Sequence, residues 1–221
     1  IRPSMNVGLR TLAITFGRLL VAITAAFFAL PLVALLVRTP WSTFAQRVTA
    51  PTVLDAARLS LIASSSAATL SLLGGLPTAA WLARGEGSIR TVVRGLLTLP
   101  MVLPPIVGGV TLLLAFGRRG LVGEPILKLT GIALPFSTIA IVLAATYVAL
   151  PFFVLSVEAG LRSFDHRHTE AAVTLGAGPL RVFFTVTLPL VAPSLRTGLV
   201  VAFARALGEF GATVTFAGNL A

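Results

Sequence analysis

Long apolar stretches separated by short polar ones dominate the hydrophobic pattern of this chain. A bilayer core is crossed by a helix of about 20 apolar residues, and five stretches reach that length. They cover approximately residues 11–37, 55–82, 95–116, 134–159 and 191–216. We therefore predict an all-α fold, a polytopic transmembrane helical bundle that forms a single domain over residues 1–221.

The third stretch contains residues that a regular helix accommodates poorly. Pro100, Pro104 and Pro105 lie close together, and each proline removes a backbone donor and clashes with the preceding turn. Broken backbone at membrane depth is tolerated only where protein buries it or where it lines a cavity. We expect these three prolines to interrupt the span and to line a path through the membrane.

The fifth stretch carries two charges, Arg205 and Glu209. Charges within a span are costly and usually face the interior of the bundle. At a spacing of four, both side chains are expected on one helix face. Two interpretations stay open: part of a translocation path or gate, or a structural ion pair that fixes the span to its neighbours. Thr213 offers a hydroxyl to a passing ion, although such a threonine more often bonds to its own helix.

The composition supports a membrane protein. The chain is 56% hydrophobic and 11% charged, with a mean hydropathy of +0.98, whereas soluble domains are about 25% charged. The net charge is +10, but the basic residues lie mainly at the ends of apolar stretches, as interfacial anchors do. Nucleic-acid binding is therefore not indicated. With no cysteine, disulfides, thiol catalysis and cysteine metal sites are excluded.

Loop charge predicts the orientation. If the spans alternate, one face holds Arg2, Arg10, Arg84, Arg90, Arg94, Arg162, Arg167 and Arg181. The other face holds Arg38, Arg47, Arg118, Arg119 and Lys128. The face richer in basic residues is expected to be cytoplasmic. The N-terminus and the polar loop at about 161–190 are then both on the cytoplasmic side.

That polar loop carries the most informative motif. It reads Glu170-Ala171-Ala172, three residues, Gly176, nine residues, and then Val186-Thr187-Leu188-Pro189. A glutamate near a helix start is favoured by the helix dipole, and a glycine either ends a helix or allows a close backbone approach. Proline sets where new helical turns begin. By itself, the pattern could also describe an ordinary amphipathic connector.

The spacing resembles the EAA loop of ABC importer permeases, with Val186 where isoleucine is usual. The resemblance implies the type I permease fold and a short cytoplasmic helix that docks into a cleft of an ATPase subunit. The residues that would couple the chain to the ATPase are Glu170, Ala171, Ala172, Gly176, Leu188 and Pro189. Such permeases typically have six spans, so a sixth is expected to be missing from this sequence.

Further stretches resemble one group within that family. Residues 99–105 with 117–120 resemble the third-span region of molybdate permeases. Residues 204–213 with 216–219 resemble the fifth span of molybdate and sulfate permeases, and residues 211–213 are more like the molybdate branch. This likeness implies a prokaryotic plasma- or inner-membrane importer of molybdate, or also tungstate, that works by alternating access. The implied partners are a second permease copy, two ATP-binding subunits and an extracytoplasmic binding protein. A sulfate or thiosulfate permease is the alternative.

No catalytic or metal site can be built from the sequence. His166 and His168 have only Asp165 as an adjacent carboxylate, and we interpret them as solvated loop residues. There is no G-x-x-x-x-G-K-[ST] phosphate loop, so we expect ATP and Mg²⁺ to be bound by the partner ATPase and no cofactor to be bound by this chain. A membrane enzyme or assembly scaffold remains an alternative, and co-purification with an ATPase would separate it from a permease.

Overall fold

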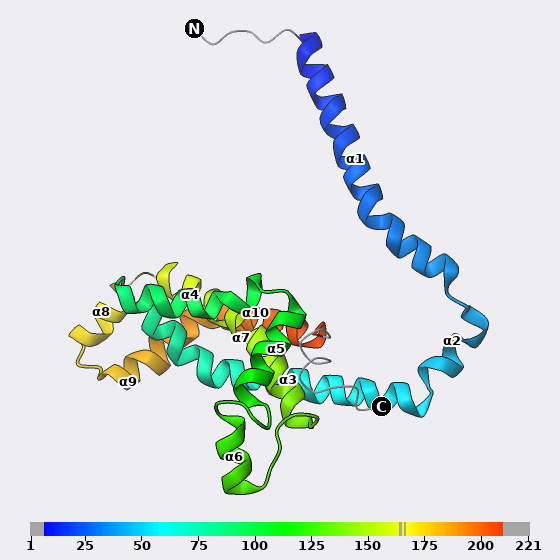
Figure 1. Ribbon diagram of the computed structural model, residues 1–221. Helices are drawn as coiled ribbons and strands as arrows, with labels where there is room; N and C mark the ends of the chain where they lie inside the picture. The colour runs from blue at the N-terminus through cyan, green and yellow to red at the C-terminus, as the bar shows by residue number, and fades with distance from the viewer. Residues whose placement is uncertain (1–6, 164, 166, 210–221) are drawn as a thin grey trace. The chain divides into compact units, whose positions relative to one another are not determined.

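The computed structural model describes residues 7–163, 165 and 167–209 of the chain (Figure 1). All the regular elements within these residues are helices, so the predicted all-α fold is confirmed. The chain divides into two compact units, Ile1–Asp55 and Ala56–Ala221. Helices satisfy their backbone hydrogen bonds internally, as a segment surrounded by lipid requires.

The first unit contains α1 (Val7–Arg38), α2 (Trp41–Val48) and the beginning of α3 (Pro51–Ala83). α1 confirms the first predicted span and continues through Pro31. Nothing in the structure buries any of its apolar stretch from Leu12 to Arg38. A long helix that is apolar all round needs lipid or other protein around it, so α1 is suited to the interior of a membrane.

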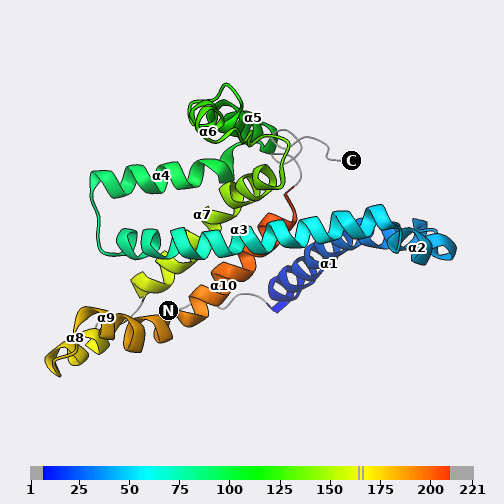
Figure 2. The ribbon, with the colours of Figure 1, turned by 90° about the horizontal axis from the view of Figure 1, so that it is seen from below.

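The second unit contains the rest of α3 and then, in chain order, α4 (Ser88–Val102), α5 (Pro105–Phe116), α6 (Gly123–Thr130), α7 (Thr138–Ser163), α8 (Arg167–Thr174), α9 (Pro179–Val182), the π-helical turn η1 (Phe183–Thr187) and α10 (Leu188–Leu207). α7 packs mainly against α10, and α4 also lies against α7. Figures 1 and 2 both place α8 and α9 at one end of this unit, away from α5 and α6.

Four helical stretches of the described chain are long and apolar enough to cross a bilayer, namely Leu12–Arg38, Pro51–Ala83, Thr138–Ser163 and Pro179–Leu207. The second, fourth and fifth predicted spans are therefore confirmed as helices, with shifted ends. The fourth begins at Thr138 rather than near residue 134, because the preceding turn includes Phe136 at a φ of 62°. α10 ends at Leu207, and residues 210–216 of the expected span lie outside the described residues.

The third predicted span is two helices. α4 ends at Val102, and Leu103 and Pro104 are extended, each with a ψ of 138°. The residue before a proline avoids the helical region, and Leu103 and Pro104 each precede one. Pro105 then starts α5, where a missing backbone donor has no cost. The expected interruption is thus confirmed at Pro104 and Pro105, but it was wrong for Pro100, which lies inside α4.

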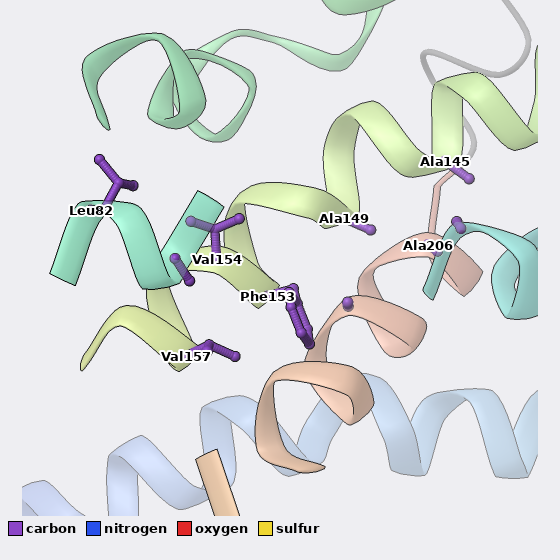
Figure 3. Close-up of a cluster of buried hydrophobic side chains, with 10 residues drawn as sticks. Leu82, Ala145, Ala149, Phe153, Val154, Val157 and Ala206 are labelled. Atoms are coloured by element: carbon purple, nitrogen blue, oxygen red, sulfur yellow. The ribbon is translucent and has the colours of Figure 1, made fainter. Parts of the chain in front are cut away.

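The core of the second unit surrounds Phe153 of α7, which is fully buried. Its ring points from α7 toward α10 in Figure 3. A Cβ atom added to Gly75 of α3 would lie 2.6 Å from one edge of the ring, and one added to Gly198 of α10 would lie 3.2 Å from the other. Two glycines therefore let α3 and α10 approach α7 closely, as small residues do in membrane bundles.

Candidate coupling loop and ion-pair network

The loop between α7 and α10 begins with the short helix α8. Asp165 accepts a hydrogen bond from the backbone N–H of Arg167 at 3.0 Å, and so satisfies a donor at the start of the helix. Glu170 lies in the first turn and is exposed, where its charge favours the positive end of the helix dipole. The prediction that Glu170 lies near a helix start is confirmed, since α8 begins at Arg167, and Ala171 and Ala172 continue the helix.

Gly176 ends this segment with a left-handed backbone at a φ of +82°. The N–H of Gly176 bonds to the carbonyl of Val173 at 2.9 Å, and the N–H of Ala177 bonds to that of Ala172 at 3.0 Å. This pair of bonds is the Schellman motif, in which glycine is favoured because it has no Cβ. The alternative of a close backbone approach at Gly176 is wrong within this chain, because a Cβ added there would meet open space.

The motif ends in a widened turn. Pro179 begins α9, and the π-helical turn η1 joins α9 to α10. Pro189 cannot donate a hydrogen bond, and its ring crowds the carbonyl four residues earlier. The N–H of Leu188 instead bonds to the carbonyl of Phe183, five residues back. The Leu188-Pro189 pair therefore marks the passage from the polar loop into the last described span.

Apolar side chains are exposed on this loop and on the start of the apolar stretch Pro179–Leu207 that follows it. Val173, Leu175, Leu180 and Phe184 are 59%, 88%, 74% and 60% exposed. They occur on α8, on η1 and on the residues between, and contacts between α8 and η1 hold these segments together. Of these, Val173 and Leu175 lie on the polar part of the connector, where exposed apolar side chains are available for contact with another protein.

A network of four charged side chains lies where α7 leads toward this loop. Glu158 of α7 is only 4% exposed. It accepts hydrogen bonds from Nη2 of Arg94 at 2.6 Å and from Nε of Arg162 at 2.9 Å. Arg162 also donates to Glu86 at 2.9 Å and to the backbone carbonyl of Leu82 at 3.3 Å. The network thus ties α7 to α4, to the end of α3 and to the loop between α3 and α4.

Glu86 is the exposed outer member of this network. The hydrogen bond from Arg162, together with its positive charge, lowers the pKa of Glu86 below 4.5. The pair of Glu86 and Arg162 therefore stabilises the folded state at pH values above the ordinary pKa of a glutamate. This stabilisation is lost as the pH falls through the lowered pKa of Glu86. At neutral pH Glu86 is therefore expected to be charged and to accept the hydrogen bond from Arg162.

Sequence reasoning missed this network. We interpreted Arg94 and Arg162 as loop charges that set the orientation, and we found no use for Glu158. A helical spacing of four between Glu158 and Arg162 was the available signal. The partner Arg94, 64 residues from Glu158 in the sequence, had no such signal.

The pair Arg205 and Glu209 is confirmed, but not its placement on one helix. Nη1 of Arg205 lies 2.9 Å from Oε2 of Glu209. α10 ends at Leu207, so Glu209 lies beyond its end. The Glu209 side chain is 2% exposed and lines a cavity of about 180 Å³ together with Ser60 and Ser64 of α3. Thr213, the remaining candidate on this segment, lies outside the described residues.

Pro100 of the proline segment lines a different cavity from the one beside Glu209. Pro100 lines an apolar cavity of about 250 Å³ with Tyr147 and Pro151 of α7. This cavity shares no lining residue with the one beside Glu209. The structure therefore places Pro100 and Glu209 in different cavities. At the break itself, Val102 is 82% and Ile106 65% exposed.

If the break lines a water-filled path, cysteine introduced at Val102 or Ile106 will react with a water-soluble thiol reagent. The chain has no cysteine of its own, so the labelling reports one position at a time. Leu112 of α5, which is 5% exposed, provides the control, and a cysteine there is expected to stay unlabelled. Protection of both break positions with and without trapped ATP would contradict a solvated path.

No three His, Asp or Glu side chains come together in a way that could hold a metal ion within the residues that the structure describes. Nδ1 of His168 lies 3.2 Å from the backbone carbonyl of Asp165, so this ring lies beside the start of α8. His166 lies outside the described residues.

Comparison with known proteins identifies the family. Residues 75–220 match the family described as "Binding-protein-dependent transport system inner membrane component". The chain belongs to this family. The match begins within α3 and includes the charged network and the whole loop between α7 and α10.

Named relatives cover most of the chain. The "Molybdenum transport system permease protein ModB" of Mycobacterium tuberculosis (strain ATCC 25618 / H37Rv) is 47% identical over 193 residues, or 87% of this chain and 73% of the relative. The protein of that name from Escherichia coli (strain K12) is 46% identical over 166 residues, or 75% and 72%. The "Probable sulfate transport system permease protein cysT" of Zygnema circumcarinatum is 36% identical over 194 residues, or 86% and 67%.

Family membership and the apolar helices together establish a multi-pass membrane protein. The chain is a permease subunit of a transport system rather than an enzyme.

Proposed function

We propose that this chain is the membrane permease of an ATP-driven molybdate importer. The observation that carries the proposal is its 47% identity, over 87% of its length, to a protein named as a molybdenum transport permease. The motif residues Glu170 to Pro189 support the ATP-driven part of the proposal. They form an exposed helix, a glycine-capped turn and a π turn at one end of the second unit.

The loop from α8 to η1 docks on a partner ATPase. Its exposed apolar residues supply the contact area, and Glu170 and Gly176 define the shape of α8 and the turn that follows. The partner subunits bind ATP and Mg²⁺, two of them serving a permease homodimer, and their closure moves the loop. The chain then lies in the inner or plasma membrane. The excess of arginine on the face that carries this loop supports placing that face on the cytoplasmic side.

Molybdate is a tetrahedral dianion, and a bare ion in a low-dielectric core faces a penalty on the order of tens of kcal/mol. It therefore needs a solvated path between the spans. The break at Pro104 and Pro105 supports a path beside α5. Arg205 is already paired with Glu209, which makes that site a poor tight binder of anions and favours a gate or structural role. Selectivity then resides mainly in the extracytoplasmic binding protein.

A sulfate permease is the second candidate, because a probable sulfate transport permease is 36% identical to this chain. Both anions are tetrahedral oxyanions, so the permease fold alone does not separate them. The larger identity to the molybdenum permeases, 47% and 46%, favours molybdate.

The experiment that tests the function reconstitutes the complete permease, its ATPase and its binding protein in liposomes. Molybdate is expected to stimulate ATP hydrolysis and to accumulate inside, with tungstate behaving similarly and sulfate having little effect. Stimulation by sulfate but not by molybdate would assign the chain to the second candidate. Absence of co-purifying ATPase would contradict the importer itself.

A further inference from the structure

The buried carboxylate of Glu158 connects the loop from α8 to η1 with the broken third span. We propose that Glu158 is a positioning residue that transmits the movement of this loop to α4 and so to the break at Leu103 and Pro104. The inference rests on the proposed function, since it concerns how ATP hydrolysis on a partner would move this chain. It assigns the role to the charged network of Glu86, Arg94, Glu158 and Arg162.

The contacts of Glu158 and Arg162 join α7, α4 and the end of α3 with the loop that follows it. Arg94 approaches its carboxylate with two donors, Nη2 to Oε1 at 2.6 Å and Nε to Oε2 at 3.4 Å. Arg162 shares Oε1 from one turn further along α7. Through Arg162 the network also holds the carbonyl of Leu82 and the side chain of Glu86. A two-donor approach by a planar guanidinium restricts direction as well as distance.

The charges within this network balance, because two carboxylates face two guanidinium groups. The Glu158 side chain is 5% exposed, and Arg94 is 28% exposed. Separating them would leave a nearly buried charge without its partner, which is strongly unfavourable. α4 and α7 are therefore expected to move together at this point, rather than to slide past each other.

The network lies between the loop that follows α7 and the break that follows α4. Arg162 belongs to the last turn of α7, and α8 begins at Arg167. On the other side, Arg94 belongs to α4, which ends at Val102 immediately before the extended break. When the loop that follows α7 moves, Glu158 therefore moves α4, the helix that precedes the break. The extended pair Leu103 and Pro104, which lies between two helices, is where the chain can change its angle.

The test replaces Glu158 with glutamine in the reconstituted complex and measures molybdate transported per ATP hydrolysed. E158Q keeps the size of the side chain and removes its charge. We expect the ATPase to co-purify and its hydrolysis to remain stimulated, while molybdate transported per ATP falls about two- to thirtyfold, the range that corresponds to the effects of mutations on coupling between sites. A merely structural role would lower transport and hydrolysis in parallel and leave their ratio unchanged, and that result would overturn the proposal.

The chain offers a matched control in Glu124, which pairs with Lys128 at 2.6 Å on the exposed helix α6. E124Q removes the same charge from an ion pair that connects no two helices, and its transport per ATP is expected to equal that of the unmodified complex. Should E158Q fail to assemble, E86Q decides the question, because Glu86 is 74% exposed and lies at the edge of the network. About a twofold fall of the ratio is expected for E86Q, and an unchanged ratio would overturn the proposal.

These measurements also separate the proposal from the proposed function. If the unmodified complex does not transport molybdate, the importer assignment fails before any variant is compared. If it transports molybdate and E158Q leaves the ratio unchanged, the assignment stands and the role of Glu158 is lost.

Discussion

Replacing Gly176 with leucine is expected to reduce molybdate uptake about tenfold while the permease still reaches the membrane. At a φ of +82°, any residue with a Cβ is strained, by roughly 1–2 kcal/mol in the left-handed region. Relief of that strain would break the bonds that Gly176 and Ala177 donate to the end of α8. The turn that would orient the loop toward the ATPase in the proposed function would then be lost.

Further substitutions at residue 176 separate the effect of backbone strain from the effect of side-chain size. Because a Cβ at residue 176 meets open space in the chain, G176A is expected to be nearly as damaging as G176L. Asparagine tolerates the left-handed region, so G176N should retain more uptake than G176A. If alanine were harmless and only leucine reduced uptake, the backbone argument would be wrong and direct crowding of the ATPase would replace it.

Gly178 provides the matched control for this loop. It has a φ of −67°, and a Cβ added there also meets open space. G178A therefore adds a methyl group only two residues away without left-handed strain. Uptake by G178A is expected to stay near that of the unmodified permease, and a loss equal to that of G176A would count against the role of the turn.

A valine at Gly75 is expected to cause a large loss of stability. A Cβ there would lie 2.6 Å from Cδ1 of Phe153 and 3.2 Å from a methyl group of Val154. Overpacking a close-packed core costs about 1–3 kcal/mol or more, and the neighbouring backbone of α3 and α7 cannot separate without losing other contacts. The midpoint of thermal unfolding in detergent should fall, along with the yield of folded permease.

Gly74, the neighbouring residue on α3, is the control for this prediction. A Cβ added at Gly74 meets nothing within 4 Å, so G74V has the same helix propensity change without the clash. Its unfolding midpoint is expected to lie well above that of G75V. Combining G75V with Phe153→Leu should recover part of the loss, since neighbours in contact are not additive. Equal midpoints for G74V and G75V would show that Phe153 does not restrict this site.

Much of the coupling loop could be predicted from sequence because its structure is local. Glu170 lies in the first turn of α8, and Gly176 ends the segment in the conformation that glycine favours. Pro179 begins a helix for the same local reason. The short helices α2 and α6 were not predicted, because we interpreted their residues only as loops between spans.

Local rules were insufficient where the surroundings decide between alternatives. Pro100 and Pro104 are both prolines in an apolar stretch, yet only Pro104 belongs to the break. Pro104 is followed directly by Pro105, so two successive residues are extended, whereas α4 continues past Pro100. Glu209 likewise has the spacing of a helical neighbour of Arg205 but lies beyond the end of α10.

The sequence alone determined the approximate positions of four spans, together with the first turn of α8 and the glycine that ends it, since apolar length and glycine act within a few residues. Only the tertiary structure showed that Phe153 packs between Gly75 and Gly198, and that Glu158 joins Arg94 to Arg162. Each of these sets combines residues from different helices. Helix packing chooses such partners by shape and by the need to neutralise buried charge, and neither leaves a spacing that can be read along the chain.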